Sequence, residues 1–374
     1  MRIAFDHQTF TLQAYGGISR YFVRVIEELL IKEEEVGIFA PYHCNQLLSM
    51  LPQNVVFGKQ ISKNDFNKPT ALALLVANQI LASKKIKKWE PSIFHETYYS
   101  FKKRTHNKYV TVITVYDMIH EKFPFYFSKL DPTSFLKRDA INRADHIICI
   151  STSTKNDLLE IFPSVRDKVS VVHLGVSLFK TLNSTVSISR PYLFYVGSRN
   201  GHKNFTNFLT SFANSKKLNS EFDIIAFGGG SFTRNEYNLM KEIGLKEEQI
   251  KHVSGNDDML ALYYKNATAF IYPSIYEGFG LPPLEAMAQG CPVVSSNSSS
   301  MPEVIGNAGE YFDPFSNEQI SAAIENVVFS NSRRNELIEL GQKRLGLFTW
   351  QNCANETHRI YRELAGVSRV QTNS

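Results

Sequence analysis

Short apolar segments alternate with helical segments along this chain, and the alternation occurs twice. The first run of short segments, rich in Ile, Val, Phe and Tyr, lies at residues 2–6, 36–40, 93–95, 109–116, 146–150 and 169–173. A polar stretch at 177–190 interrupts the pattern, which restarts at 192–196 and continues to about residue 345. Short buried strands separated by helices indicate a parallel, doubly wound sheet. The sequence therefore predicts an α/β protein built on two such sheets.

The polar interruption sets the expected domain boundaries. We expect an N-terminal Rossmann-like domain at residues 1–178, a C-terminal Rossmann-like domain at 179–346, and a final helix with a polar tail at 347–374. A length of 374 residues suits two or three domains. Open α/β sheets bind ligands beyond the carboxyl ends of their strands. Two such domains facing each other would therefore form a central cleft that holds the binding site.

Several other classes of protein are excluded by composition and by the first residues. No apolar run approaches the roughly 18–20 residues that a membrane-spanning helix needs. The chain reaches an acid at Asp6 without the apolar stretch of a signal peptide. The four cysteines lie far apart, without the paired spacing of a zinc or redox motif. We expect reduced thiols in a cytoplasmic protein.

The whole chain carries a formal net charge of +5. The positive charge is concentrated in its first half. Basic clusters stand at residues 84–88, beside Trp89, and at 102–104. Such clusters suit peripheral contact with an anionic membrane, at about 1 kcal/mol per cation. Solvated lysines at the end of a helix are the alternative explanation. No nucleic-acid-binding motif is present in the sequence, so we expect no nucleic-acid partner.

Chemistry-bearing residues gather in the segment Tyr276–Glu285, which follows a predicted strand and opens a predicted helix. Its glycines, Gly278 and Gly280, let the backbone approach a ligand closely, and a helix N-terminus favours negative charge. The loop can therefore hold a phosphate with backbone amides while Glu277 and Glu285 accept hydrogen bonds from sugar hydroxyls. A turn with a capping acid would explain the glycines but not both acids.

From residue 272 to residue 304 the sequence resembles the signature of retaining, nucleotide-sugar-dependent glycosyltransferases with the GT-B fold, in the group 1 (family 4) class. The resemblance rests on two glutamates with seven residues between them, Glu277 and Glu285, on Gly290-Cys291-Pro292-Val293-Val294 and on Pro302-Glu303-Val304, and it extends over nearly the whole chain. It implies transfer of a hexose from a nucleotide-diphosphate sugar, GDP-mannose or a UDP-sugar, to a glycan or polyprenyl-linked saccharide. Mannosyl transfer in O-antigen, capsule or exopolysaccharide assembly, at the inner face of the membrane, is the expected setting.

The resemblance also implies roles for particular residues. Glu285 would bind the ribose of the nucleotide, and Glu277 would hold the transferred sugar. Backbone amides of the loop would bind the diphosphate, which two cations would grip without a metal ion. A mobile glycine loop near the N-terminus would close on the phosphates, and the last helix would cross back to the N-terminal domain. The residues concerned are Gly278, Phe279, Gly280 and Leu281 in the loop, Arg199 and Lys203 as the cations, and Gly16 and Gly17 in the glycine loop.

One departure from the family pattern concerns the catalytic residue of the N-terminal domain. The strand at 109–116 is followed by Asp117, and Tyr116 stands where many relatives carry a histidine. His120 follows three residues later, and His95 ends the preceding strand. We expect one or more of Asp117, His120 and His95 to contact the reacting sugar, with Asp117 favoured, and a contact from Tyr116 is left open.

Retention of the anomeric configuration without a well-placed carboxylate nucleophile suggests a front-face path. In that path the departing phosphate oxygen takes the proton of the acceptor hydroxyl. Glu277 would orient the sugar. No metal ion is expected, because Asn256-Asp257-Asp258 lacks the Asp-any-Asp pattern and is interpreted as a turn. A sugar phosphorylase, a nucleotide-sugar epimerase or a non-catalytic nucleotide-sugar-binding scaffold remains an alternative. A dehydrogenase is disfavoured because no Gly-x-Gly-x-x-Gly follows the first strand.

Overall fold

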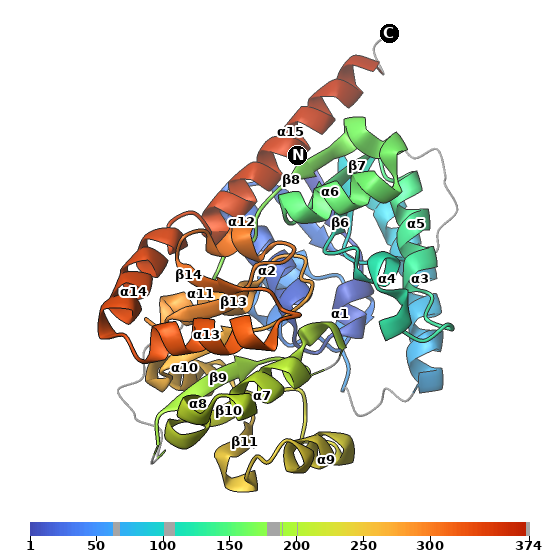
Figure 1. Ribbon diagram of the computed structural model, residues 1–374. Helices are drawn as coiled ribbons and strands as arrows, with labels where there is room; N and C mark the ends of the chain where they lie inside the picture. The colour runs from blue at the N-terminus through green and yellow to red at the C-terminus, as the bar shows by residue number, and fades with distance from the viewer. Residues whose placement is uncertain (63–67, 101–108, 178–187, 189, 200, 372–374) are drawn as a thin grey trace. The chain divides into compact units, whose positions relative to one another are not determined.

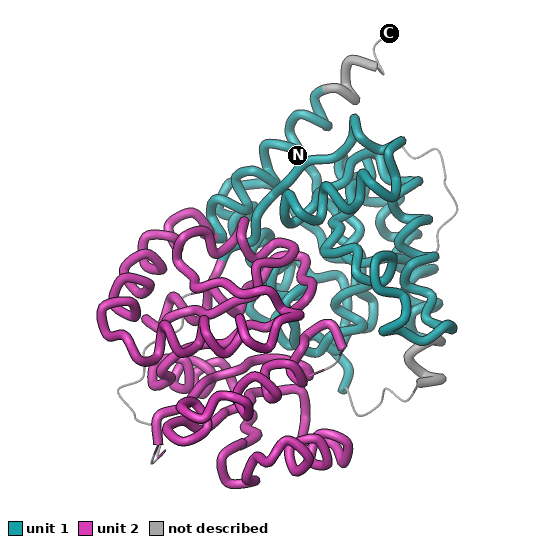
Figure 2. Tube along the Cα trace, in the orientation of Figure 1, with its two compact units in different colours: residues 1–175, 350–374 teal, residues 176–349 magenta. Residues whose placement is uncertain are grey.

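The computed structural model describes residues 1–62, 68–100, 109–177, 188, 190–199 and 201–371 (Figure 1). The chain divides into two compact units, coloured separately in Figure 2. Unit 1 comprises residues 1–175 and 350–374, and unit 2 comprises residues 176–349. The boundaries predicted from the sequence lie after residue 178 and at residue 347. The polar stretch 177–190 falls almost entirely outside the described residues.

A six-stranded parallel sheet forms the centre of unit 1, in the order β2-β1-β5-β6-β7-β8. Its strands are β1 (Arg2–Phe5), β2 (Glu35–Ile38), β5 (Ile93–Glu96), β6 (Val110–Val115), β7 (His146–Cys149) and β8 (Val169–Val171). A small parallel pair, β3 (Tyr42–His43) with β4 (Lys59–Gln60), lies apart from it. The order reverses between β1 and β5, which makes that point the switch point of the sheet.

Helices cover both faces of the unit 1 sheet (Figure 1). They are α1 (Gln8–Leu12), α2 (Gly17–Ile31), α3 (Lys68–Trp89), α4 (Ile119–Lys122), α5 (Thr133–Arg143), α6 (Thr152–Ile161) and α15 (Trp350–Gln371), with 3-10 turns η1 (Leu47–Met50), η2 (Gln53–Val55), η4 (Pro124–Tyr126) and η5 (Pro163–Lys168). Helix α15 packs against α2 and β6. On the other face, Ala82 and Ile86 of α3 pack with Ala4, Phe39 and Phe94. The last helix of the chain is thus part of the N-terminal unit.

Unit 2 contains a second six-stranded parallel sheet, in the order β11-β10-β9-β12-β13-β14. Its strands are β9 (Tyr192–Val196), β10 (Asp223–Phe227), β11 (Ile250–Val253), β12 (Ala269–Tyr272), β13 (Val293–Ser296) and β14 (Gly309–Phe312). Numbered within the unit, this order is 3-2-1-4-5-6, the arrangement of Rossmann domains. The order reverses between β9 and β12.

The helices of unit 2 form two layers on this sheet, with α7, α8 and α13 packed together on one side and α10 and α11 on the other (Figure 1). They are α7 (Phe205–Asn214), α8 (Lys216–Glu221), α9 (Arg234–Glu242), α10 (Asp257–Asn266), α11 (Leu281–Ala288), α12 (Met301–Ile305), α13 (Asn317–Val328) and α14 (Asn331–Leu345), with 3-10 turns η6 (Gly201–Lys203) and η7 (Glu247–Gln249). Asn256, which was predicted to begin a turn, caps α10 by accepting a hydrogen bond from Met259 N. Two Rossmann-like α/β sheets are therefore confirmed.

All four cysteines are buried and form no disulfide. In the part of the chain that the structure describes, none of the helices combines the length and the apolar character needed to cross a bilayer.

Candidate functional site

The loops at the switch point of unit 2 carry most of the predicted binding residues. The segment 197–204 leaves the carboxyl end of β9, and the segment 273–280 leaves the carboxyl end of β12. Because β9 and β12 are neighbours in the sheet, these two loops emerge side by side. Ligands of open α/β sheets bind at this position.

An ion pair joins the two loops. Lys203 Nζ lies 2.7 Å from Glu277 Oε1, and both side chains are largely shielded from solvent. Burial pushes the pKa of Glu277 upward, but Lys203 and the nearby hydroxyl groups of Ser274 and Tyr272 together outweigh burial and hold the pKa below its ordinary value. Glu277 is therefore a carboxylate at neutral pH, beside a cation at the carboxyl ends of the strands.

The backbone of the two loops is fixed by hydrogen bonds around this pair. Asn204, in a left-handed conformation, donates from its side-chain amide to Pro273 O at 3.0 Å and to Pro314 O at 2.7 Å. Ile275 N donates to His202 O at 2.7 Å. Lys203 and Glu277 are thus held on a rigid base, which is how a binding site keeps its geometry before the ligand arrives.

Helix α11 begins directly after the glycine-rich loop. Gly280, with φ of 110°, precedes its first residue, Leu281. Ser300 Oγ donates to Glu277 O at 2.9 Å and to Phe279 O at 2.7 Å, and Ser299 Oγ donates to Glu277 O at 2.6 Å. Two carbonyls of the loop are therefore turned toward serines, while the positive end of α11 stands beside Glu277 and Lys203. This arrangement suits a diphosphate.

Glu285 lies on α11, one turn inside the helix. Tyr264 of α10 donates its hydroxyl to Glu285 Oε2 at 3.5 Å. Burial and the nearby Glu285 carboxylate raise the pKa of Tyr264 well above its ordinary value, so this phenol stays a donor. The second predicted glutamate is thus placed on the same helix whose N-terminus faces the loop.

Arg199 occupies a different position from Lys203. Its guanidinium donates to Glu236 and to the backbone carbonyls of Gly228, Gly230 and Ser231, and its side chain is 4% exposed. It also stacks on Phe232, at 4.7 Å from the ring centroid. These contacts favour a structural role for Arg199, which ties the 197–204 segment to the triple-glycine turn after β10.

In unit 1, Asp117 and His120 share the segment that follows β6. The Asp117 side chain is 34% exposed, and its Oδ1 accepts a hydrogen bond from Ile119 N at 3.0 Å. His120 stacks on Phe127 with ring centroids 3.8 Å apart, and its Nε2 lies 3.6 Å from Asp131 Oδ2. Both predicted residues thus belong to one short segment at the carboxyl end of β6.

His95 and Tyr116 lie in the core of unit 1. His95 is 0% exposed, and its ring nitrogens contact the Tyr361 hydroxyl of α15 and, at 2.9 Å, Thr114 Oγ1. Burial lowers the pKa of His95 to about 3, so the ring is neutral. The Tyr116 hydroxyl donates to Thr97 O at 2.9 Å. Burial of these two side chains favours Asp117 and His120 as the groups that meet a substrate.

Gly16 and Gly17 stand at the amino end of α2. Gly16 is its N-cap residue and Gly17 its first residue. A Cβ added at Gly17 would meet nothing within 4 Å, whereas one at Gly16 would lie 2.5 Å from Gln13 Oε1. The pair therefore lies at a helix N-terminus, as a phosphate-binding glycine loop would.

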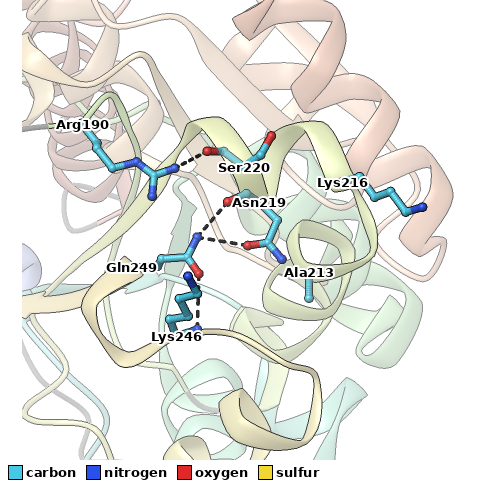
Figure 3. Close-up of a pocket in the computed structure, with 7 residues that line it drawn as sticks. All are labelled: Arg190, Ala213, Lys216, Asn219, Ser220, Lys246 and Gln249. Carbon is cyan, nitrogen blue, oxygen red and sulfur yellow. Dashed lines mark hydrogen bonds between the residues drawn. The ribbon is translucent and has the colours of Figure 1, made fainter.

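A basic hollow of about 370 Å³ lies elsewhere in unit 2 (Figure 3). It is lined by Arg190, Ala213, Lys216, Asn219, Ser220, Lys246 and Gln249. Its polar groups bond mainly to one another, since Arg190 donates to Ser220 O and Gln249 donates to Asn219. Several of these residues directly precede β9, β10 and β11, so the hollow lies at the amino ends of the strands, away from the switch-point loops.

Sequence reasoning missed the residues that support the site. Asn204 follows Lys203 directly, and Ser299 and Ser300 end a serine run after β13, so their positions were visible but their partners were not. Lys137 and Glu121, which contact each other beside Asp117, gave no local signal, because their contact joins separate helices.

Comparison with known protein families accounts for both units. The family model "Glycosyltransferase Family 4" matches residues 15–179, and the model "Glycosyl transferases group 1" matches residues 184–344. The O-antigen chain mannosyltransferase B of Escherichia coli is 26% identical over 93% of this chain and 96% of its own length. The O-antigen chain mannosyltransferase RfbU of Salmonella typhimurium is 28% identical over 58% of this chain and 60% of its own length.

Solved structures share the fold across the whole chain. Sucrose-phosphate synthase from Thermosynechococcus elongatus aligns with a TM-score of 0.76 at 19% identity, covering 98% of this chain and 99% of that one. Anabaena HepE, in complex with UDP and glucose, aligns with a TM-score of 0.71 at 16% identity, covering 97% and 100%. Fold and family models together define the class: the protein is a glycosyltransferase with the GT-B fold. The chain belongs to the group 1, family 4 glycosyltransferases.

Proposed function

We propose that this glycosyltransferase is a retaining enzyme that moves a hexose from a nucleotide-diphosphate sugar to a hydroxyl of a glycan or polyprenyl-linked saccharide. The observation that carries the donor site is the Lys203–Glu277 pair, at 2.7 Å, between two loops at the switch point of unit 2. A cation, a carboxylate and a helix N-terminus together match a diphosphate attached to a sugar, because the phosphates need positive charge and the hydroxyls need acceptors.

Each donor-site residue has a proposed role. Lys203 and the amino end of α11 neutralise the diphosphate, with the loop amides of Gly278, Phe279, Gly280 and Leu281 close to the phosphates. Glu277 accepts hydrogen bonds from the sugar, and Glu285 accepts them from the ribose. Arg199 anchors the 197–204 segment through its hydrogen bonds to the carbonyls of Gly228, Gly230 and Ser231.

The reaction exchanges one glycosidic bond for another on the same face of the sugar. The bond between the anomeric carbon and the phosphate oxygen breaks, and the acceptor oxygen bonds to that carbon. The acceptor proton passes to the departing phosphate oxygen, so atoms and charges balance. Lys203 and α11 stabilise the charge that builds on the leaving diphosphate, and such stabilisation is commonly a large part of catalysis.

Unit 1 supplies the acceptor residues in this proposal. Asp117 orients the reacting hydroxyl, because it is the most exposed of the predicted residues at a strand end. His120 lies three residues away in the same segment, and Gly16 and Gly17 present the amino end of α2. His95 has a packing role between β6 and α15, given its contacts with Thr114 and Tyr361.

Mannose is the proposed sugar, and cell-surface polysaccharide is the proposed destination. The O-antigen mannosyltransferases of Escherichia coli and Salmonella typhimurium support this choice. The structural neighbour that holds UDP and glucose keeps a UDP-sugar as the competing donor. No metal ion is needed in this proposal, because Lys203 and the helix N-terminus supply the positive charge.

Peripheral contact with an anionic membrane, at its cytoplasmic face, is the proposed location. Lys84, Lys85, Lys87 and Lys88 are all exposed along the last turns of α3. The same helix also exposes the apolar side chains of Val76, Ile80 and Leu81. The second basic cluster, at 102–104, lies outside the described residues.

A transfer assay with anomeric analysis tests the proposal. Purified protein is incubated in EDTA with GDP-mannose, or with UDP-glucose, and a mannose-terminated oligosaccharide, and the product is examined by NMR. We expect an extended oligosaccharide with the α-configuration of the donor retained. Inversion would refute the front-face path. Release of free sugar or consumption only with inorganic phosphate would instead indicate an epimerase or a phosphorylase.

A further inference from the structure

A lysine is buried beside the proposed acceptor residue. Lys137, on α5, is 1% exposed and belongs to none of the motifs that define the family resemblance. Lysine is almost never fully buried unless it is paired. Its partner is Glu121 of α4, whose Oε2 accepts a hydrogen bond from Lys137 Nζ at 2.7 Å. An ion pair between two helices is therefore built into this end of the sheet.

The same ammonium group also contacts Asp117. Lys137 Nζ donates to the main-chain oxygen of Asp117 at 2.9 Å and lies 3.6 Å from its carboxylate Oδ1. Below it, the ring of Tyr99 lies 5.5 Å from the nitrogen. An ammonium group has three N–H donors. Here Glu121, Asp117 and the ring of Tyr99 surround the group.

The contact between Lys137 and Asp117 does more than join two helices, because it holds Asp117 in a fixed orientation. Asp117 is held at its carbonyl by Lys137 and at its Oδ1 by Ile119 N, at 3.0 Å. The Asp117 side chain nevertheless remains 34% exposed. One cation also stands between two carboxylates, which would otherwise repel each other across the turn. Among the contacts that the structure describes for Asp117, Lys137 is the cation that fixes the direction of the carboxylate.

We propose that Lys137 is a positioning residue for glycosyl transfer, acting through the carbonyl and carboxylate of Asp117. The inference rests on the proposed function, in which Asp117 orients the acceptor hydroxyl. A displacement of about 1 Å at a reacting group can cost on the order of 100-fold in rate. Lys137 holds the turn at Asp117 from the buried side and so prevents such a displacement. The carboxylate stays accessible to substrate.

A double-mutant cycle tests the inference with GDP-mannose as donor and a mannose-terminated oligosaccharide as acceptor. We expect Lys137→Met to lower kcat by about 100-fold, with the dissociation constant of GDP unchanged within about twofold, because Lys203, Glu277 and Glu285 lie in unit 2. If Lys137 acts through Asp117, adding Lys137→Met to Asp117→Asn lowers kcat no further than about threefold. A full additional loss in the double variant would overturn the inference.

A charge-balanced variant separates positioning from folding. Lys137→Met combined with Glu121→Gln removes the buried cation and its counter-charge together, so the melting temperature should return toward that of the wild type. We expect kcat to stay low in this variant, and recovery of kcat along with stability would show that Lys137 is only structural. Lys122→Met is the matched control, because Lys122 pairs on the surface with Asp157 and Glu160, and its kcat should be unchanged.

The cycle also distinguishes this inference from the proposed function. Wild-type kcat in Asp117→Asn would refute the role of Asp117, and the Lys137 inference with it. A strong loss in Asp117→Asn together with near-normal kcat in Lys137→Met would refute the Lys137 inference alone.

Discussion

At the scale of single residues, the two basic side chains of the 197–204 segment have separate duties. Lys203 reaches across to Glu277 at the mouth of the sheet, whereas Arg199 is enclosed by Glu236 and three backbone carbonyls. The sequence shows both only as cations in a glycine-rich segment. Because the difference depends on contacts with residues some 30 to 70 positions away, it emerges only in the folded chain. The two residues should therefore respond differently to substitution.

Replacing Lys203 with alanine should impair catalysis. The diphosphate loses a cation, and the Glu277 carboxylate is left without its partner, so we expect kcat/KM to fall by roughly 100- to 1,000-fold. Initial rates with GDP-mannose measure the loss, and a melting curve checks that the protein remains folded. Lys216→Ala, in the basic hollow at the amino ends of the strands, is the control and should keep its rate. A folded Lys203→Ala variant with near-normal turnover would contradict the assigned role.

Replacing Arg199 with methionine should impair stability first. Glu236 and the carbonyls of Gly228, Gly230 and Ser231 would lose their shared donor, at a cost of about 2–3 kcal/mol in the free energy of unfolding. Denaturant unfolding measures this cost, and the exposed Arg234→Met, on the neighbouring helix, should change it by less than about 0.5 kcal/mol. Unchanged stability combined with loss of GDP binding would instead assign Arg199 to the diphosphate.

At the scale of elements, the turn after β10 supports the loop after β9. Gly229 has φ of 71°, and a Cβ placed on it would lie 2.7 Å from Gly197 O. A side chain at this position would therefore strain its own backbone and push on the segment that carries Lys203. Gly229 is therefore required for packing against the donor loop, although the triple glycine lacks the spacing of a dinucleotide-binding motif.

Gly229→Ala should lower the free energy of unfolding by about 1–3 kcal/mol and raise the KM for the donor. Steady-state kinetics and denaturant unfolding follow the two effects. As a matched control, Gly366→Ala changes an exposed helical glycine of α15 with open space around it and should stabilise the protein by up to about 1 kcal/mol. An unaltered donor KM in a destabilised Gly229→Ala variant would show that the turn does not support the donor loop.

The docking of α15 gives unit 1 a pH-dependent stability. His95 is buried against Tyr361, and its pKa is lowered by burial to about 3, whereas in the unfolded chain it lies near 6.5. Between these values the unfolded state binds the extra proton, so stability is complete above about pH 6.5 and falls as the pH drops toward 3. We expect the wild type to lose about 2 kcal/mol more than His95→Gln between pH 7 and pH 5. Urea unfolding at both pH values measures this, and equal losses would contradict the buried neutral histidine.

At the scale of the whole molecule, the alternation of short strands and helices predicts both sheets, because buried parallel strands need continuous apolar segments. The pattern around Tyr276–Glu285 likewise predicts a ligand loop at a helix N-terminus. Contacts between residues distant in sequence are harder to predict. His95 lies near the end of β5, where a catalytic residue could stand, yet Tyr361 of α15, near the end of the chain, covers it. Lys137 carries no local signal, because its partners belong to other elements.

The donor site of unit 2 can be tested by nucleotide binding alone. Thermal unfolding of the purified protein is followed in EDTA with GDP-mannose, UDP-glucose, GDP or UDP. We expect one nucleotide family to stabilise the protein, by about 2.7 kcal/mol at roughly 100 times its dissociation constant, and we expect Lys203→Ala to abolish the shift. Absence of a shift with every nucleotide, or a shift that survives Lys203→Ala unchanged, would contradict a donor site at the switch point of unit 2.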